Sequence, residues 1–371
     1  MNKELQEIIT QFERLESAVI KTVLATVVDV KGSSYRLPGA RMLIGENGEM
    51  FGTVSGGCLE VDVLERAWRV RQAGAAEVFT YDTTGREDSV FSLNMGCRGI
   101  IRILLERPSH NLIDFFRKLY QSRQNGLIAT LIKPETETNG QIGNRLLLAA
   151  GNIHSSDLSK EITSGILPDC LTACSEKRSK HLTTEVGEFF LEFVSPPISL
   201  LVFGAGFDAV PLCETAKILG WHVALIDHRA AFANRERFPK VDEIIISRPE
   251  NVGEKVTVDE NTVAVVMTHN YENDRIILRF LLNSKAAYVG ALGPKRRTEN
   301  VLRELSEAGE NFSLQQIEKL YAPVGLDIGA DTPESIAVSI IAEIKSVLEN
   351  REGGFLRERK GSIYNRNGAF V

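Results

Sequence analysis

The sequence lacks the cysteine spacing that iron–sulfur clusters, structural zinc sites and disulfide frameworks require. Its five cysteines are odd in number, scattered and without a Cys-x-x-Cys pair; they are Cys58, Cys97, Cys170, Cys174 and Cys213. Because disulfide-rich chains belong to oxidising compartments, this set indicates a reducing environment and predicts a cytoplasmic protein.

Long apolar runs and an excess of basic residues are also missing. No run approaches the roughly 18 apolar residues that a membrane-spanning helix needs. Residues 1–16 are polar and amphipathic, without the apolar core of a signal peptide. The 43 Lys and Arg residues stand against 49 Asp and Glu, which gives a net charge of -6. We therefore expect neither a membrane nor a nucleic acid as a partner.

The C-terminal half carries a dinucleotide-type fingerprint. An apolar run over residues 198–203 is followed by Gly204-Ala-Gly206-x-x-Ala and then by a helical pattern. The glycines allow a tight turn that brings backbone N–H groups close to a phosphate at a helix N-terminus.

Strand and helix patterns alternate from this motif to about residue 350, which predicts a parallel sheet with helices on both faces. Asp227 ends the second predicted strand, where an acid accepts hydrogen bonds from ribose hydroxyls. His228 and Arg229 are alternative ligands for a 2′-phosphate. The strands are expected at 198–203, 222–227, 242–247, 262–268 and 287–291, and the helices at 211–219, 274–282, 297–307 and from 333 onward.

Two further strand ends point to the same crevice, because ligands of open parallel sheets bind beyond the carboxyl ends of the strands. His269 follows the fourth strand, and Lys295 and Arg296 lie near a helix start after the fifth. Basic residues and free N–H groups there suit an anion. A structural histidine and a solvated helix face are the alternative interpretations.

The N-terminal half contains an unusual cysteine. A helix expected over residues 58–73 begins at Cys58, directly after Ser55-Gly56-Gly57. A helix start favours a thiolate, but the helix dipole supplies only roughly 0.3–1 kcal/mol, so a reactive thiol there needs a cation as well. Arg36 and Arg41, around a loop between two predicted strands, are the candidates. The alternative is a small residue selected for packing.

A second glycine–cysteine turn contains Gly96, Cys97 and Arg98. A Cys58–Cys97 pair could hold a sulfur, a soft metal or a disulfide, although the sequence does not establish that the two are close. We interpret Cys170 and Cys174 as incidental. We find no internal repeat.

Together these motifs resemble those of the XdhC/CoxI family, the maturation factors of xanthine dehydrogenase and related molybdenum hydroxylases. The resemblance covers residues 20–105 and 198–348. Its marks are Gly32–Arg36, Pro38–Arg41, Ser55–Glu60 and Gly96-Cys97 in the first half, and Phe203–Pro211, Asp227–Arg229, Thr268-His269, Leu292–Arg297, Pro323–Gly329 and Thr332–Glu334 in the second.

The resemblance implies binding of the molybdenum cofactor (molybdopterin), help with its sulfuration, and its delivery to an apo-hydroxylase of the xanthine dehydrogenase type. A cysteine desulfurase is a further candidate partner, and a homodimer is the expected assembly. Cys58 would hold the molybdenum or its sulfur, and the pterin would contact residues around the glycine turns, namely Arg36, Arg41, Ser55, Gly56, Gly57 and Cys97. Family members often have a small residue where Arg98 stands and an aspartate where Asn270 stands, and residues 106–195 carry no family mark.

We therefore predict an α/β protein with an N-terminal α+β module (1–195), a Rossmann-like domain (198–350) and a loosely ordered tail (351–371). The leading hypothesis is an accessory factor that handles molybdenum cofactor, with NAD(P) or another nucleotide as a second candidate ligand. An NAD(P)-dependent oxidoreductase, with Asp227 binding ribose and His269 relaying a proton, is the alternative. A third hypothesis is a scaffold protein whose dinucleotide-type fingerprint binds no ligand.

Overall fold

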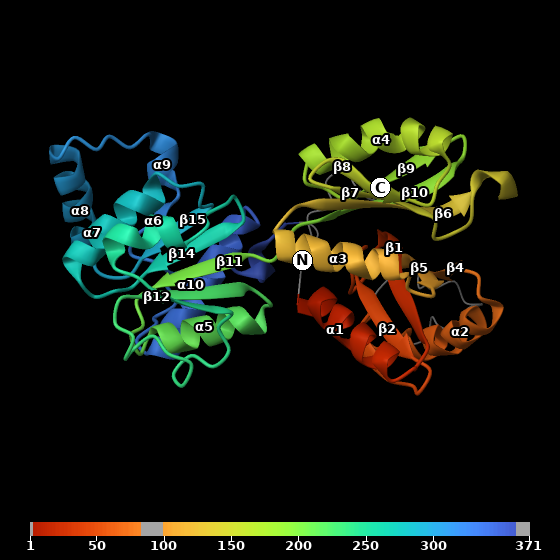
Figure 1. Ribbon diagram of the computed structural model, residues 1–371, viewed down its shortest axis with the longest axis horizontal. Helices are drawn as coiled ribbons and strands as arrows, with labels where there is room; N and C mark the ends of the chain where they lie inside the picture. The colour runs from red at the N-terminus through yellow and green to blue at the C-terminus, as the bar shows by residue number, and fades with distance from the viewer. Residues whose placement is uncertain (1–2, 83–98, 361–371) are drawn as a thin grey trace. The chain divides into compact units, whose positions relative to one another are not determined.

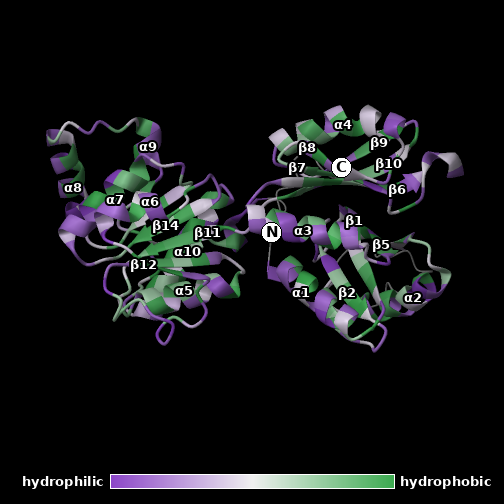
Figure 2. Ribbon diagram, in the orientation of Figure 1, coloured by the Kyte–Doolittle hydropathy of each residue, from purple (hydrophilic) through white to green (hydrophobic). Residues whose placement is uncertain are grey.

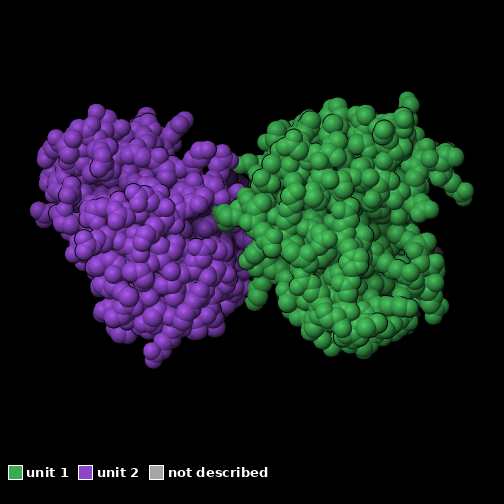
Figure 3. Space-filling view, viewed as in Figure 1, with its two compact units in different colours: residues 1, 3–196, 361–371 green, residues 2, 197–360 purple. Residues whose placement is uncertain are grey.

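The computed structural model describes residues 3–82 and 99–360, which divide into two compact units (Figure 3). The described part of unit 1 lies within Lys3–Pro196, and unit 2 comprises Pro197–Lys360. Cys97 and Arg98, and residues 361–371 of the predicted tail, lie outside the described residues. In the described part of the chain, no helix is long and apolar enough to cross a membrane.

Unit 1 contains two antiparallel five-stranded sheets, ordered β3-β2-β1-β5-β4 and β8-β7-β6-β10-β9 (Figure 1). Its first half is built from α1 (Lys3–Ser17), β1 (Thr22–Gly32), β2 (Arg41–Gly45), β3 (Met50–Gly52), α2 (Glu60–Ala73), β4 (Glu77–Asp82) and β5 (Gly99–Glu106). Its second half is built from α3 (His110–Ser122), β6 (Gly126–Pro134), η1 (Glu137–Asn139), β7 (Arg145–Ala149), β8 (Asn152–Ser156), α4 (Lys160–Ser175), β9 (Lys180–Thr184) and β10 (Gly187–Val194).

The two halves of unit 1 repeat one architecture, although no repeat is apparent in the sequence. Each half runs helix, three strands, helix, two strands, and the strand order of the two sheets is equivalent. The registers agree as well: the pairs Thr26–Arg41 and Leu24–Glu106 in the first half match Thr130–Arg145 and Ile128–Glu192 in the second. Three equivalent positions keep the same residue, Thr26 and Thr130, Arg41 and Arg145, and Glu106 and Glu192, but such isolated identities do not mark a repeat in the sequence.

Two buried ion pairs join the sheets of unit 1. Arg41 of β2 pairs with Glu192 of β10, and Arg145 of β7 pairs with Glu106 of β5. Since Arg41 and Arg145 occupy equivalent positions, as do the two glutamates, the pairs connect the halves crosswise. The Arg41 guanidinium also lies over the Phe116 ring, 4.9 Å from its centroid. Arg41 is therefore part of the core and is not the free cation near Cys58 that the sequence suggested.

Unit 2 is a parallel six-stranded sheet ordered β13-β12-β11-β14-β15-β16. Its elements are β11 (Ser199–Phe203), α5 (Ala209–Ile218), β12 (His222–Asp227), β13 (Glu243–Ile246), η2 (Pro249–Asn251), α6 (Val252–Lys255), β14 (Thr262–Val266), α7 (Tyr271–Leu282), β15 (Tyr288–Ala291), α8 (Lys295–Glu307), α9 (Leu314–Glu318), β16 (Leu320–Tyr321), α10 (Pro333–Leu348) and η3 (Leu356–Glu358).

The strands of unit 2 consist mainly of hydrophobic residues (Figure 2), and apolar side chains pack on both faces of the sheet, as in other parallel sheets. Side chains of α5 and α10 pack on one face, and those of α6, α7 and α8 pack on the other. The chain returns to the centre of the sheet between β13 and β14, so the strand order reverses beside β11. This confirms the predicted Rossmann-like fold and places its ligand crevice at the carboxyl ends of β11 and β14.

Candidate functional sites

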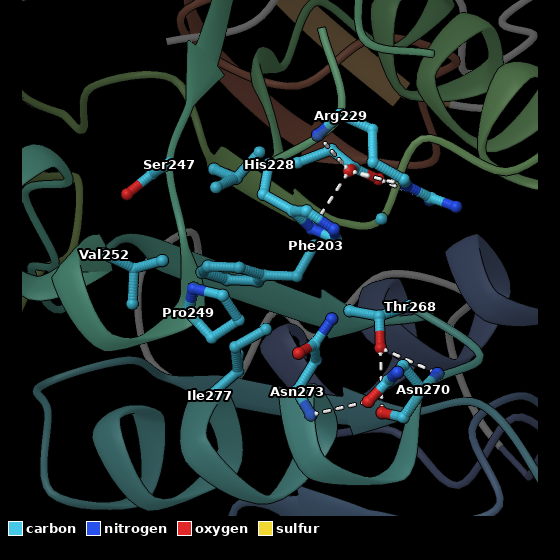
Figure 4. Close-up of a pocket in the computed structure, with 13 residues that line it drawn as sticks. Phe203, His228, Arg229, Ser247, Pro249, Val252, Thr268, Asn270, Asn273 and Ile277 are labelled. Atoms are coloured by element: carbon cyan, nitrogen blue, oxygen red, sulfur yellow. Dashed lines mark hydrogen bonds and ion pairs between the residues drawn. The ribbon is translucent and has the colours of Figure 1, made fainter. Parts of the chain in front are cut away.

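A pocket of about 280 Å³ opens at the carboxyl ends of β11, β12 and β14 and beside α6 and α7 (Figure 4). Its walls combine apolar side chains with neutral or paired polar ones. The lining residues are Phe203, Gly204, Ile226, Asp227, His228, Arg229, Ser247, Pro249, Val252, Thr268, Asn270, Asn273 and Ile277. The volume suits a heterocyclic ring with its sugar better than a whole dinucleotide.

The glycine turn after β11 requires its glycines. Gly204 has φ +116, and a Cβ there would lie 2.4 Å from the Met267 carbonyl oxygen. A Cβ on Gly206 would lie 2.4 Å from Oδ1 of Asp208. A substitution at Gly204 would force the backbone of the turn to move, whereas at Gly206 the Asp208 side chain, which pairs with His269, would have to move.

Arg237 holds this turn from its carbonyl side. Its guanidinium donates to the carbonyl oxygens of Ala205 (2.8 Å) and Gly206 (3.3 Å). On the other side, we find no hydrogen-bond acceptor among the described residues for the backbone N–H groups of Gly206 and Phe207. The turn therefore presents donors beside the N-terminus of α5, and sequence reasoning did not identify Arg237 as its support.

Asp227 is engaged within the protein. Its Oδ2 accepts from the Ala205 N–H (2.8 Å) and Arg229 Nη2 (2.7 Å), and its Oδ1 accepts from the Arg229 N–H (2.8 Å) and Nε (3.0 Å). Burial opposes ionisation, but the hydrogen bonds from Arg229 and from the Ala205 backbone outweigh it and lower the pKa of Asp227. The carboxylate thus ties the glycine turn to Arg229.

His269 stands next to the glycine turn, but it does not line the pocket. Its Nε2 lies 2.7 Å from Oδ2 of Asp208, and its backbone has φ +58, an unusual value for a residue other than glycine. Asn270 caps α7 by accepting from the Asn273 N–H (3.1 Å). An aspartate, which family members often have there, would make the same cap, so this departure preserves the local structure.

The basic residues predicted after β15 do not reach the pocket. Lys295 and Arg296 are exposed on the first turn of α8 and are absent from the lining. Arg297, the next residue, forms a 2.7 Å ion pair with Asp274 of α7. The structure therefore brings Gly204 and Asp227 to the pocket, places Gly206 and His269 beside it, and leaves Lys295 and Arg296 outside.

Cys58 lies in a turn that precedes α2 and is not the first residue of the helix, which begins at Glu60. Gly56, Gly57 and Cys58 form the exposed part of this turn. Ser55 is buried beneath it, and its Oγ accepts from the N–H groups of Gly57 and Leu59, both at 3.1 Å. The cysteine is therefore accessible at the tip of a hydrogen-bonded turn.

Glu60 anchors the same turn. Its carboxylate accepts from Thr53 Oγ1 (2.6 Å), the Ser55 N–H (3.0 Å) and hydroxyl, and the Leu59 N–H (3.2 Å). Burial opposes ionisation, but the hydrogen bonds from Ser55 and Thr53 outweigh it and lower the pKa of Glu60. Arg36, the other cation that the sequence suggested, is paired with Glu4 of α1.

The internal repeat shows that this turn is longer in the first half than at the equivalent place in the second. Seven residues, 53–59, connect β3 to α2, whereas the equivalent connection from β8 to α4 has three, 157–159. In the second half Ser159 caps its helix directly, accepting from the Ile162 N–H at 3.2 Å. The first half thus carries an elaborated turn where its copy has a minimal one.

Among the described cysteines, Cys58 differs in exposure. Cys170 and Cys213 are buried, and burial raises the pKa of each thiol to about 12; Cys174 is half-buried. Within residues 3–82 and 99–360, no group of three or more His, Cys, Asp or Glu side chains could hold a metal ion. Among these residues, a metal bound at Cys58 would therefore find one thiolate ligand and no cluster of further ligands.

Replacing Glu60 by glutamine is expected to loosen the Cys58 turn. An amide offers one acceptor oxygen where the carboxylate offers two, so either the Ser55 N–H or the Ser55 hydroxyl loses its acceptor, at a cost of about 1–3 kcal/mol. Thermal unfolding should report a lower midpoint, and thiol labelling of Cys58 in the folded protein should become faster. Glu65→Gln, at an exposed position of the same helix, should change neither; unchanged labelling in Glu60→Gln would contradict this role.

Comparison with known proteins identifies the family. Two family models match, the XdhC Rossmann domain over residues 200–344 and the XdhC and CoxI family over residues 16–82. A Bacillus subtilis (strain 168) protein, named as a probable subunit of xanthine dehydrogenase, is 32% identical over 331 residues, which are 87% of this chain and 92% of that protein. The chain belongs to the XdhC/CoxI family. The match to the second model falls within the first half of unit 1 and includes the Cys58 turn.

Two further relatives of this XdhC/CoxI protein are similar along most of its length. The molybdenum cofactor insertion chaperone PaoD of Escherichia coli (strain K12) is 23% identical over 332 residues, 89% of this chain and 84% of PaoD. A solved structure described as a xanthine dehydrogenase from Bacillus halodurans has 29% identity and a TM-score of 0.75, covering 93% of this chain and 96% of that one.

Proposed function

We propose that this protein binds the molybdenum cofactor and delivers it to an apo-hydroxylase of the xanthine dehydrogenase type. The observation that carries the proposal is the similarity, along 89% of the chain, to a protein named a molybdenum cofactor insertion chaperone. The relative named as a probable xanthine dehydrogenase subunit supports the choice of client. Support of sulfuration, with a cysteine desulfurase as sulfur donor, a cytoplasmic location and a homodimeric assembly belong to the same proposal.

The Cys58 turn is the part of unit 1 that we assign to the cargo. Molybdenum is a metal that thiolate sulfur binds well, and an exposed thiol on a fixed turn offers one such ligand without enclosing the metal. The Tyr35 ring lies against Gly56 and is 62% exposed, so it offers a flat surface beside the cysteine on which a pterin ring can stack. Cys97 stays a candidate second sulfur ligand, although it lies outside the described residues.

We assign the unit 2 pocket to a nucleotide, either a portion of the cofactor or a separate molecule. Its position at the strand-order reversal and its size support this assignment. An NAD(P)-dependent oxidoreductase is the second candidate function, and the His269–Asp208 pair favours it. A histidine oriented by a carboxylate at the edge of such a crevice has the geometry of a proton-transfer group.

Anaerobic purification with metal and pterin analysis tests the proposal. Protein expressed in cells that make the cofactor should contain molybdenum and a pterin that fluoresces after oxidation. On mixing, it should activate an apo-hydroxylase, and alone it should not oxidise xanthine. Absence of pterin together with failure to activate any apo-hydroxylase would contradict the proposal, and nucleotide-dependent oxidation of an alcohol or aldehyde would favour the second candidate.

A further inference from the structure

We propose that the unit 2 pocket holds its nucleotide by the base and does not read the ribose 2′,3′-diol. This inference rests on the nucleotide part of the proposed function and specifies the ligand group that the pocket recognises. It departs from the usual expectation for this fold, in which the acid at the end of the second strand accepts hydrogen bonds from the ribose hydroxyls.

The acceptor positions of Asp227 are already filled. A carboxylate has about four lone-pair sites, and four protein N–H donors occupy them, two on each oxygen: those of Ala205 and of the Arg229 backbone, Nε and Nη2. The Asp227 side chain is 3% exposed. A ribose hydroxyl would have to displace the Ala205 N–H or the Arg229 guanidinium. The first change would detach the glycine turn from Asp227, and the second would leave the buried Asp227 carboxylate without its counter-charge.

Among the described residues that line the pocket, Asp227 is the one carboxylate, so no other acid there takes over this role. Ser247, at the end of β13, is buried and donates its hydroxyl to the Arg248 carbonyl oxygen at 3.0 Å. The ribose end of the pocket therefore lacks a charged acceptor with a free position, which is what makes this fold selective for a diol.

The free polar groups lie at the other end of the pocket, on the first turn of α7. We find no partner among the described residues for the Asn273 side-chain amide, and Figure 4 shows this side chain directed into the pocket between Ile277 and Asn270. An amide carries both a donor and an acceptor, which matches the edge of a nucleobase. Pro249, Val252 and Ile277 supply the apolar walls between which a planar ring can lie.

Calorimetric titration of the full chain tests the inference. The probes are ADP and 2′-deoxy-ADP, followed by CDP, GDP and UDP. We expect the Kd values of ADP and its deoxy analogue to agree within about twofold, whereas the preferred base should bind more than tenfold tighter than the weakest one. A charged acceptor reading the 2′-hydroxyl would instead make the deoxy analogue at least about tenfold weaker.

Asn273→Ala should weaken the preferred nucleotide about tenfold and remove most of the discrimination between bases. Asn283→Ala is the matched control, because Asn283 caps the far end of the same helix, donating to the Arg279 carbonyl oxygen at 3.1 Å. Tighter binding of ADP than of its deoxy analogue by tenfold or more, or unchanged base preference in Asn273→Ala, would overturn this inference but not the proposed binding of a nucleotide. Failure of every nucleotide to bind would overturn it together with the nucleotide part of the proposed function.

Discussion

Glu192→Ala is expected to destabilise unit 1 by about 3–5 kcal/mol, because it leaves the buried Arg41 guanidinium without its counter-charge. The side chains of Arg41 and Glu192 are 6% and 10% exposed, and the guanidinium donates to both carboxylate oxygens. After the substitution the cation keeps its hydrogen bond to the Gly39 carbonyl oxygen, at 2.9 Å, but no carboxylate. A loss of this size is a large fraction of the stability of an ordinary domain.

Urea unfolding, followed with probes that distinguish the two units, would measure the effect. Glu106→Ala should cost a similar amount, because Glu106 occupies the equivalent position and pairs with the buried Arg145. Glu13→Ala is the matched control: Glu13 pairs with Arg117, but both side chains are well exposed, so the change should stay below about 1 kcal/mol. An equal, small effect of all three substitutions would show that the two buried ion pairs do not stabilise the contact between the sheets of unit 1.

Replacing both partners by apolar residues distinguishes the net stabilisation by the ion pair from the cost of leaving one buried charge unpaired. Arg41→Met combined with Glu192→Leu should recover most of the stability lost in Glu192→Ala, since well-packed apolar side chains often substitute for a buried ion pair at no cost. This outcome would also show that Arg41 serves packing between the sheets.

The fold of unit 2 could be predicted because its signals are local. The predicted strands are short apolar runs, rich in β-branched residues in Thr262–Val266, and the glycine turn follows β11 directly. The predicted start of a helix at residue 333 is likewise confirmed, because Thr332 caps α10 and Pro333 opens it, and both signals depend on neighbouring residues alone. Signals of this kind need no knowledge of the partner across the fold, so they survive in the sequence.

The failures concern side-chain partners that the sequence pattern does not reveal, whether they are distant in the chain or only a few residues away. Arg41 and Glu192 are 151 residues apart, and nothing near either residue indicates that they pair. Asp227 stands at the position that the motif predicts, but Arg229, only two residues away, occupies half of its acceptor sites with its side chain. The helix predicted from Cys58 begins at Glu60, because the Glu60 carboxylate folds back on Ser55 and closes the turn before the helix starts.

Cys58→Ser is expected to reduce retention of the molybdenum cofactor at least tenfold while leaving the fold intact. A hydroxyl is a poorer ligand than a thiolate for a soft metal, and even changes to residues that only support a metal's ligands typically cost about 10–100-fold in affinity. Because Cys58 is exposed on its turn and the hydrogen bonds of that turn use Ser55 and Glu60, circular dichroism and thermal unfolding should not change.

Molybdenum and oxidised pterin, measured per chain after anaerobic gel filtration, give the readout, and activation of an apo-hydroxylase provides a second one. Cys174→Ser is the matched control, because Cys174 is half-buried on α4 in the other half of unit 1. It should retain cofactor as the unsubstituted protein does. If Cys58→Ser retains molybdenum and pterin at the unsubstituted level and still activates the hydroxylase, the cargo is held elsewhere. Loss of cofactor in both serine variants would instead point to a general effect on unit 1, since the two cysteines lie in different halves of the repeat.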